Sequence, residues 1–379
     1  MEGIKTVFIS TAPLPYLGIS SWTTEMNYLL NKNNEIDYVI GPISKIKIEK
    51  PKQIVVKDKT IIDKLYSKLD YSNRFNNYIR ALKKVLKLEE NIILQVKDNF
   101  GLLKSILLFI DKYNLRNRIY VQYHYHSFSP FTNDEKVISQ IDELVLLTIT
   151  SYKQIMDKVY SFPVRVTINN DGVDSKKFKP INSEKKKIFK ESLGIDSNKI
   201  IFTWCSQDRK KKGLDLILEA WEKVYSKNKD IQLLVFGVEK EIFVKGVKIM
   251  GLVSNDNLIK YYQLSDFYLF PTIWHEGFGL SLVEALKCGC YCISAKNGST
   301  SYVLNNGAYG KLIEQPNIIN EWVKCIQESI KEYTLNNKEN IYLKNIPQKI
   351  YDIEDWYLRY NNNIKEAKKS FYHRYYLDK

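Results

Sequence analysis

The sequence predicts an α/β protein with two doubly wound parallel sheets that face each other across a cleft. Short apolar, β-branched runs alternate with helix-period segments such as 214–225, a pattern typical of parallel sheets covered by helices. Ten such runs are too many for one small sheet, and 379 residues are too many for one ordinary core. The runs that predict strands are 6–10, 36–40, 91–96, 119–124, 143–149, 199–205, 231–237, 247–251, 267–271 and 291–295.

A turn-rich and charged stretch, 169–187, marks the expected boundary between the two domains. We expect an N-terminal domain over 1–175 and a C-terminal domain over 176–355. In doubly wound sheets, ligands bind at the carboxyl ends of the strands, where loops lead into helix N-termini. The functional residues are therefore expected in such loops.

Composition limits the class of protein and its partners. Apolar residues make up 44% of the chain, which predicts a packed globular protein. The 57 Lys and Arg against 43 Asp and Glu give a net charge of +14, which favours an anionic partner: nucleotide phosphate, lipid headgroup, acidic glycan or nucleic acid. The first residues lack the pattern of a signal peptide, and no window reaches the roughly 18 apolar residues of a membrane span. Together with five cysteines, an odd number, this predicts reduced thiols in a cytoplasmic protein.

Two glutamates, Glu276 and Glu284, stand eight residues apart in 271-PTIWHEGFGLSLVEALKCGC-290, across the expected start of a helix. Eight helical residues rise about 12 Å. A carboxylate at each end of that span could hold hydroxyls on either side of a diphosphate, which would fit a nucleotide-sugar. The alternative is an ordinary helix with an acidic first turn.

The start of the same helix has the features of an anion site. Free backbone N–H groups and the positive end of the helix dipole attract anions at a helix N-terminus. Gly277 and Gly279 have no Cβ, so the backbone could approach a ligand closely. A phosphate is therefore expected on the amides near Phe278 and Leu280.

Four segments, in this order, resemble glycosyltransferase family 4, a family of retaining enzymes with the GT-B fold of two Rossmann-like domains. The resemblance covers nearly the whole chain and is densest from 165 to 310. It implies an acceptor side in the N-terminal domain, a donor side in the C-terminal domain, and a tail over 356–379 that packs back toward the first domain. The four segments are 166-VTINNDGVDSKKFKP-180, 212-KGLDLILEAW-221, 231-IQLLVFG-237 and 271–299.

The resemblance assigns roles to three residues. It places Glu276 against the donor sugar, Glu284 on the ribose hydroxyls, and Lys212 beside the diphosphate leaving group. Fixed cations and helix amides would stabilise the negative charge that develops on the β-phosphate. No DxD-like pair stands where a divalent ion would be needed, so no cofactor and no metal are expected. If the acceptor attacks the donor sugar on the face from which the leaving group departs, the leaving phosphate takes the acceptor proton. No residue is then expected to act as a general base.

The sequence departs from the family pattern at two places. Gln207 stands where relatives usually have an arginine before the lysine. Arg209 could supply that cation together with Lys212, or it could belong to a solvated loop. Further on, Gly298 is kept but Ser301 replaces an acid, which leaves sugar or acceptor contacts there in doubt.

The loop after the first predicted strand contains Gly18, Ile19 and Ser20. Relatives often have paired glycines at this position. Its amides could face the donor phosphate or the acceptor, and Ser20 is a plausible helix N-cap. The alternative is a plain turn between strand and helix.

Three histidines are further candidates for the sugar pocket. His124 and His126 end a predicted strand, and the resemblance implies that His124 contacts the donor sugar. A metal pair has no supporting ligand, and a lone histidine is more often structural. His275, next to Glu276, either lines the sugar pocket or is an ordinary loop residue.

Positive charge is concentrated between residues 44 and 118, which hold 18 Lys and Arg against 8 Asp and Glu. A helix predicted over 74–87 has an apolar face, with basic residues elsewhere around it. It is either a core helix with a solvated basic face or part of a domain that uses anionic lipid to reach a lipid-linked acceptor.

The sequence therefore predicts a retaining, metal-independent glycosyltransferase at the inner face of a membrane. It would move a hexose-type sugar from a UDP- or GDP-sugar to a glycan or lipid-linked acceptor in surface polysaccharide biosynthesis. One alternative is a glycosyltransferase that acts on modified nucleic acid, such as phage DNA. Another is a non-catalytic nucleotide-sugar-binding protein.

Overall fold

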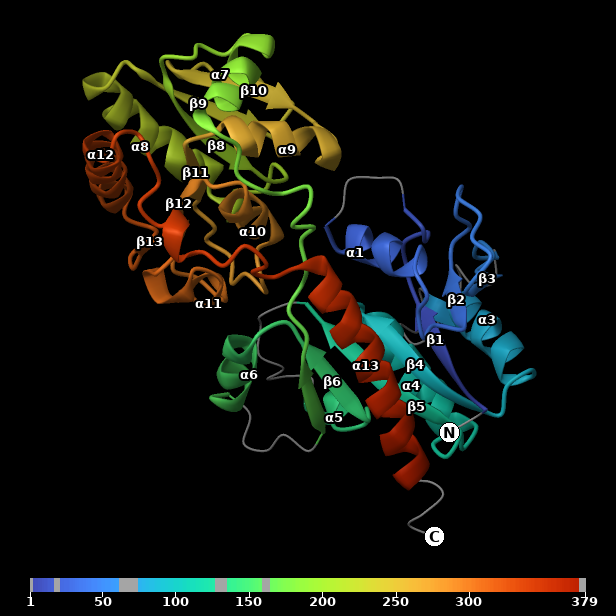
Figure 1. Ribbon diagram of the computed structural model, residues 1–379. Helices are drawn as coiled ribbons and strands as arrows, with labels where there is room; N and C mark the ends of the chain where they lie inside the picture. The colour runs from blue at the N-terminus through green and yellow to red at the C-terminus, as the bar shows by residue number, and fades with distance from the viewer. Residues whose placement is uncertain (1–2, 17–20, 61–73, 127–134, 159–163, 375–379) are drawn as a thin grey trace. The chain divides into compact units, whose positions relative to one another are not determined.

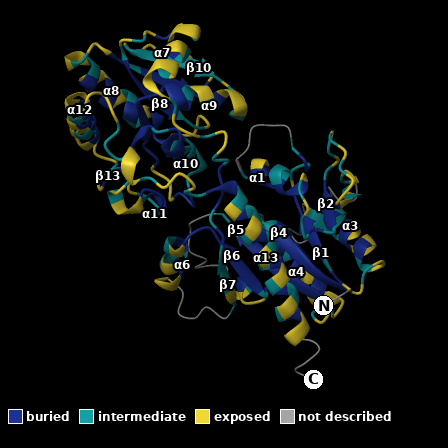
Figure 2. Cartoon of the chain, viewed as in Figure 1, coloured by how far each residue is buried: buried dark blue, intermediate teal, exposed yellow. Residues whose placement is uncertain are grey.

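The computed structural model describes residues 3–16, 21–60, 74–126, 135–158 and 164–374, and the chain forms two compact units (Figure 1). The N-terminal unit comprises Met1–Asp171 and Glu354–Lys379, and the C-terminal unit comprises Gly172–Ile353. Each unit is a parallel sheet with helices packed against it, and the strands form its buried centre (Figure 2). The prediction of two doubly wound parallel sheets is confirmed.

In the described part of the N-terminal unit, seven parallel strands form one sheet in the order β3-β2-β1-β4-β5-β6-β7. The order reverses at β1, which pairs with both β2 and β4. The strands are β1 Ile4–Ile9, β2 Tyr38–Gly41, β3 Lys52–Val55, β4 Asn91–Lys97, β5 Ile119–Tyr125, β6 Glu143–Leu146 and β7 Arg165–Ile168.

Helices of the N-terminal unit cover both faces of this sheet. On one face, Leu94 and Val121 pack into a core with α3 and α4, while on the other Ile93 and Tyr120 pack against Phe371 of α13. This follows from the alternation of side chains along a strand. The helices are α1 Ser21–Leu30, α3 Asn76–Leu86, α4 Phe100–Lys112, α5 Glu135–Ile138, α6 Ile149–Met156 and α13 Ile353–Tyr372.

A row of buried polar side chains crosses the sheet beneath α13. The Tyr360 hydroxyl donates to Gln95 Oε1 (2.9 Å), Gln95 Nε2 donates to Gln122 Oε1 (2.9 Å), and Gln122 Nε2 donates to Glu143 Oε2 (2.8 Å). Buried polar groups of this kind are costly unless they are bonded. Because hydrogen bonds are directional, the row fixes the orientation of α13 on this face of the sheet, in addition to its apolar contacts.

In the C-terminal unit, six parallel strands of the described chain form a sheet in the order β10-β9-β8-β11-β12-β13. The order reverses at β8, which pairs with β9 and β11. The strands are β8 Ile200–Cys205, β9 Ile231–Phe236, β10 Val247–Gly251, β11 Phe267–Phe270, β12 Tyr291–Ala295 and β13 Gly310–Ile313.

Helices α8 and α12 share one apolar core with this sheet, in which Trp221 and Trp322 are fully buried. Helix α9 packs against α7 and α10. The helices are α7 Ser183–Ser192, α8 Leu214–Lys227, α9 Asn255–Leu264, α10 Leu280–Lys287, α11 Thr300–Val303 and α12 Ile319–Leu335, with short 3-10 helices η2 Lys210–Lys212, η3 Asn305–Gly307 and η4 Leu343–Asn345.

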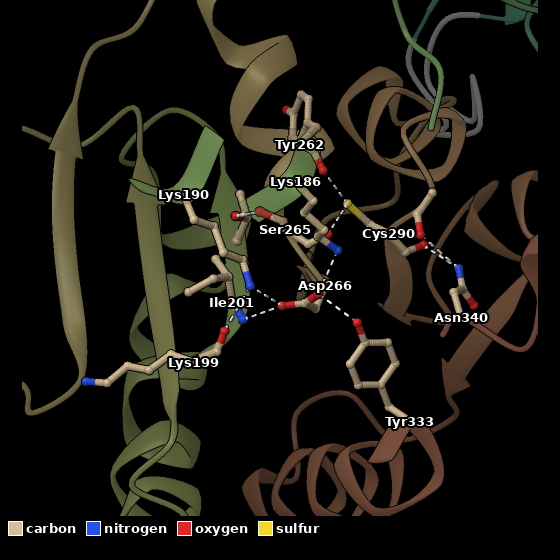
Figure 3. A network of polar contacts seen from close by, with 12 residues as sticks. Lys186, Lys190, Lys199, Ile201, Tyr262, Ser265, Asp266, Cys290, Tyr333 and Asn340 are labelled. Carbon is tan, nitrogen blue, oxygen red and sulfur yellow. Dashed lines mark hydrogen bonds and ion pairs between the residues drawn. The ribbon is translucent and has the colours of Figure 1, made fainter. Parts of the chain in front are cut away.

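A buried carboxylate, Asp266, ties four elements together at the amino end of β11 (Figure 3). Its Oδ1 accepts from Lys186 Nζ (2.6 Å) and the Tyr333 hydroxyl (2.7 Å), and its Oδ2 accepts from the Ile201 amide (2.8 Å) and Lys190 Nζ (3.3 Å). Burial alone would raise the pKa of Asp266, but the two ammonium groups and the amide outweigh burial and hold the pKa below its usual value. Every acceptor site of this carboxylate thus has a donor.

Three strands were not predicted: β3, β7 and β13. Each has four residues and several partly exposed positions, so none forms the continuous apolar run that marked the other strands. The strand predicted over 143–149 ends at Leu146, because Thr148 caps α6 by accepting from the Ser151 amide (3.1 Å).

Candidate active site

Two neighbouring strands of the C-terminal unit bring the predicted donor residues to one edge of the sheet. Strand β8 ends at Cys205, and η2 then carries Lys212; strand β11 ends at Phe270, and the following loop leads to α10. The carboxyl ends of paired parallel strands meet at the same edge. The Ile273 amide donates to Lys211 O (3.0 Å), which fastens one loop to the other.

Lys212 and Glu276 form an ion pair at this edge. The Glu276 side chain is buried, and Lys212 keeps 22% of its side chain exposed. The Thr272 hydroxyl lies 2.9 Å from Glu276 Oε1 and donates to it. The structure therefore brings together two residues that were predicted to act on the same donor, 64 positions apart in the chain.

Gly298 allows a second loop to hold the backbone of Glu276. The two residues form an isolated parallel bridge, and the Ser299 amide donates to Glu276 O (2.8 Å). Gly298 has φ +65°, and a Cβ there would lie 2.4 Å from Glu276 N and O. No other residue type fits without moving the loop, so the glycine predicted near the sugar pocket has a visible structural reason.

Helix α10 begins one residue after Gly279, which adopts φ +94° as its N-cap. No side chain caps this helix start, so the first amides are left for other acceptors. Gly277 is buried, and Phe278 is buried with its ring 5.1 Å from that of Tyr351. Packing of these two residues thus holds the backbone near Leu280 in place. Phosphate binding there stays a prediction.

Glu284 lies one turn into α10 and is partly buried. Burial raises the pKa of Glu284 to about 7, against the opposing effect of the neighbouring Tyr262 hydroxyl. A carboxyl group with such a pKa is half protonated near neutral pH. Perturbed groups of this kind gather at functional sites, because a ligand supplies the missing partners.

The cationic stretch before Lys212 is mostly exposed. Arg209 and Gln207 both lie at the surface, in a turn where the Arg209 amide donates to Gln207 O (2.8 Å). The Lys212 amide donates to Arg209 O (2.8 Å). Arg209 is therefore on the segment that positions Lys212, but its side chain is not packed against the Glu276 pair.

Two further residues at this edge were not predicted from the sequence, Thr272 and Trp274. Trp274 is 42% exposed, with Lys211 Nζ 4.0 Å from the centre of its ring. Its neighbour His275 is also exposed. A hydroxyl four residues before Glu276 was the available signal for Thr272; nothing local marked Trp274, because its partner comes from η2.

The predicted candidates of the N-terminal unit differ in what the structure says of them. Gly18, Ile19 and Ser20 lie outside the described residues. His124 is buried in β5 with its ring 5.6 Å from that of Tyr360, and its Nε2 has no hydrogen-bond partner within the described chain. Burial, and then the Lys97 charge, lower the pKa of His124 to about 3, so the ring is neutral. His126 follows β5, and its amide donates to Asp98 Oδ1 (3.3 Å).

A group of ionisable residues near the end of β4 was also missed. Lys97 pairs in register with His124 and lies 5.0 Å from the Trp22 ring centre. Burial raises the pKa of Asp171 to about 6, while the nearby Lys97 and a bond to Glu25 oppose that rise. The carboxyl groups of Glu25 and Asp171 are both buried, so the carboxyl end of the N-terminal sheet is polar, like that of the C-terminal sheet.

Across the described parts of the chain, no three His, Cys, Asp or Glu side chains gather as metal ligands. Nor is any helix among these residues long and apolar enough to cross a membrane.

The candidate site lies in a part of the chain that matches a known protein family. Residues 185–346, most of the C-terminal unit, match the model of the family described as glycosyl transferases group 1. D-inositol 3-phosphate glycosyltransferase of Rhodococcus erythropolis is 22% identical over 215 residues, covering 52% of this chain and 48% of that protein. A probable sucrose-phosphate synthase of Thermosipho melanesiensis is 25% identical, covering 51% and 42%. The chain thus spans about half the length of the curated relatives it matches.

Solved structures resemble the chain over nearly its whole length. Sucrose-phosphate synthase of Thermosynechococcus elongatus gives a TM-score of 0.74 at 13% identity, covering 97% of this chain and 99% of that one. A glycosyltransferase of Rickettsia africae gives 0.70 at 16%, covering 97% and 100%. Anabaena HepE in complex with UDP and glucose gives 0.64 at 15%, covering 97% and 99%. These neighbours show the GT-B fold.

Proposed function

We propose that this protein is a retaining glycosyltransferase that moves a hexose-type sugar from a UDP- or GDP-sugar to a glycan or lipid-linked acceptor. The observation that carries the proposal is the ion pair between partly exposed Lys212 and buried Glu276, beside the start of α10, which no side chain of the described chain caps. It lies at the carboxyl edge of the sheet, in the region that matches the glycosyl transferases group 1 family.

Each group has a chemical task in this reaction. The Lys212 ammonium and the first amides of α10 stabilise charge on the β-phosphate as the sugar–phosphate bond breaks. Glu276 accepts hydrogen bonds from hydroxyls of the donor sugar, and Glu284 accepts hydrogen bonds from hydroxyls of the ribose. The leaving phosphate takes the acceptor proton on the same face, so the anomeric configuration is retained without a metal ion.

The ion pair with Glu276 also prepares Lys212 for this task. Glu276 holds the ammonium at a fixed place, so little reorganisation is needed when a diphosphate arrives. In the N-terminal unit, His124 is a further candidate to meet the donor sugar, because its Nε2 has no hydrogen-bond partner among the described residues. His126 and the loop of Gly18, Ile19 and Ser20 are lesser candidates of the same unit, and His275 is a lesser candidate of the C-terminal unit.

The setting that we propose for the reaction follows from the family resemblance. Resemblance to family 4 favours surface polysaccharide or lipopolysaccharide biosynthesis in the cytoplasm. The names of the relatives include enzymes of inositol phosphate and sucrose phosphate, so phosphorylated small acceptors belong in the tests beside glycans.

The first experiment is a thermal-shift panel of UDP, GDP, CDP, ADP and their common sugars, with and without EDTA. One nucleotide should raise the melting temperature independently of EDTA, and Glu284→Ala should weaken that rise. Release of the same nucleotide from its sugar is then followed for wild type and Glu276→Gln. A panel without any shift would sink the donor site itself.

Two outcomes would favour the alternatives. Nucleotide-sugar binding without turnover, with every acceptor class tried, would favour a binding protein. Salt-sensitive binding of duplex DNA, together with glucosylation of modified bases, would favour a nucleic-acid substrate.

A further inference from the structure

Helices α3 and α4 of the N-terminal unit carry a surface rich in exposed basic residues. Helix α3 contains Arg80, Lys83 and Lys84 and no acidic residue, and Lys87 follows as its C-cap. These four side chains are exposed. In the described part of the chain, no carboxylate pairs with Lys83, Lys84 or Lys87.

The basic residues of α3 continue onto α4. Lys83 Nζ lies 5.4 Å from the Phe109 ring centre and 4.7 Å from that of Tyr113, and 3.5 Å from the Tyr113 hydroxyl. Exposed Lys112 lies on the same side, 5.9 Å from the Tyr113 ring. Both helices run antiparallel to one parallel sheet, so their C-terminal ends meet at one edge. We call this region, from Arg80 to Leu88 and from Leu108 to Tyr113, the α3–α4 surface.

Two leucines and one tyrosine stand exposed among these charges. Leu88 is 60% exposed, Leu108 is 55% exposed, and Tyr113 is 49% exposed. Cations in the last turn of a helix are explained by its dipole alone. The dipole does not explain why two leucines face water beside them, since both helices already bury a full apolar face in the core.

We propose that the α3–α4 surface docks onto an anionic lipid bilayer. Each lysine near an anionic leaflet is attracted to its headgroups and adds to the affinity. Leucine side chains between them enter the boundary between headgroups and acyl chains, while the lysine stems lie along it. A nucleic acid would use the charges but would gain nothing from exposed leucines, so lipid fits the whole surface better. This proposal does not depend on the sugar transfer proposed above.

The test is co-sedimentation of the full chain with phosphatidylcholine vesicles, with and without phosphatidylglycerol, at low and high salt. Wild type should bind the anionic vesicles at low salt and the neutral ones weakly. Lys84→Glu/Lys87→Glu should reduce binding about tenfold or more, and Leu108→Asn severalfold. The matched control is Lys324→Glu/Lys331→Glu on α12, which changes net charge equally at exposed sites of the other unit. It should bind as wild type does.

Three results would overturn the proposal: no binding of wild type to anionic vesicles, equal losses in the two double variants, or no effect of Leu108→Asn. Tighter binding of duplex DNA than of vesicles, lost in Lys84→Glu/Lys87→Glu, would assign the surface to nucleic acid instead. Nucleotide-sugar turnover should be unchanged in all variants, which confirms that they are folded and separates this test from that of the proposed function.

Discussion

The two edges of the C-terminal sheet hold buried carboxyl groups with opposite properties. At the amino edge, Asp266 has four donors, and its pKa is held below the usual value. Near the carboxyl edge, burial raises the pKa of Glu284 to about 7, and among the described residues only the Tyr262 hydroxyl acts against that rise. A fully bonded carboxylate fixes the fold. One that is desolvated without partners has acceptor sites left for a ligand.

Among the substitutions proposed here, Asp266→Asn should cause the largest loss of stability. The change keeps the shape but leaves Lys186 and Lys190 without their counter-charge in a buried place. We expect the free energy of unfolding to fall by about 3–5 kcal/mol, as when one partner of a buried pair is removed. Urea unfolding followed by circular dichroism measures it.

Asp256→Asn is the matched control for that change. Asp256 also pairs with a lysine, Lys177 (2.9 Å), but both side chains are more than half exposed. Solvent screens such a pair, so stability should hardly change. Equal effects of the two substitutions would show that burial at the amino edge is not what matters.

Lys212→Met should separate function from stability at the carboxyl edge. If Lys212 stabilises the leaving diphosphate, its loss should lower kcat about 10²–10³-fold. Stability should fall less than in Asp266→Asn, because Lys212 is partly exposed and Thr272 still bonds Glu276. Steady-state release of nucleotide, read with urea unfolding, tests both.

Lys211→Met controls for charge in the same segment, since Lys211 lies over Trp274 instead of meeting Glu276. It should keep most of the turnover. If the two variants lose activity equally, the ion pair is not the donor site and only local positive charge counts.

The contrast between the edges also explains what the sequence could predict. The start of α10 is local: Glu276, Gly279 and Glu284 stand close in the chain, and a strand, a glycine loop and a helix are enough to place them. The partners of Asp266 come from three elements, α7, β8 and α12, spread over more than 130 positions, and no periodicity brings them together. Their positions depend on how the helices pack across the sheet.

Intermediate cases show where local reasoning stops. Lys212 was predicted beside the diphosphate, but its bond to Glu276 depends on β8 and β11 being neighbours. His124 was predicted at a strand end, which is correct, but its place against Tyr360 depends on the return of α13. The sequence is enough to place candidate residues in loops and at strand ends, whereas contacts between distant elements depend on how the chain folds.

Donor binding should depend on pH through Glu284. Because its folded pKa is raised from 4.5 to about 7, the folded protein keeps a proton that the unfolded chain has lost. Its contribution to stability therefore falls as pH rises through that window. Binding has the opposite sign: ribose hydroxyls donate to the carboxylate, so affinity should fall about tenfold per unit below pH 7. Calorimetry with an intact nucleotide-sugar measures this affinity, because its esterified diphosphate does not titrate in this pH range. Glu284→Gln should bind the same nucleotide-sugar independently of pH.

Arg209→Ala should have the smallest effect, because its side chain is exposed on the turn before Lys212. If the guanidinium reaches the donor diphosphate, its removal raises the KM for the donor about three- to tenfold, and added salt narrows the difference from wild type. Lys210→Ala is the control, an exposed cation that follows Arg209 directly as the first residue of η2. A rise in KM for Arg209→Ala alone would show that Arg209 takes the place of the arginine that relatives have at Gln207. Equal and small rises would mean that only Lys212 acts, and that the rest of 209–212 is a solvated loop.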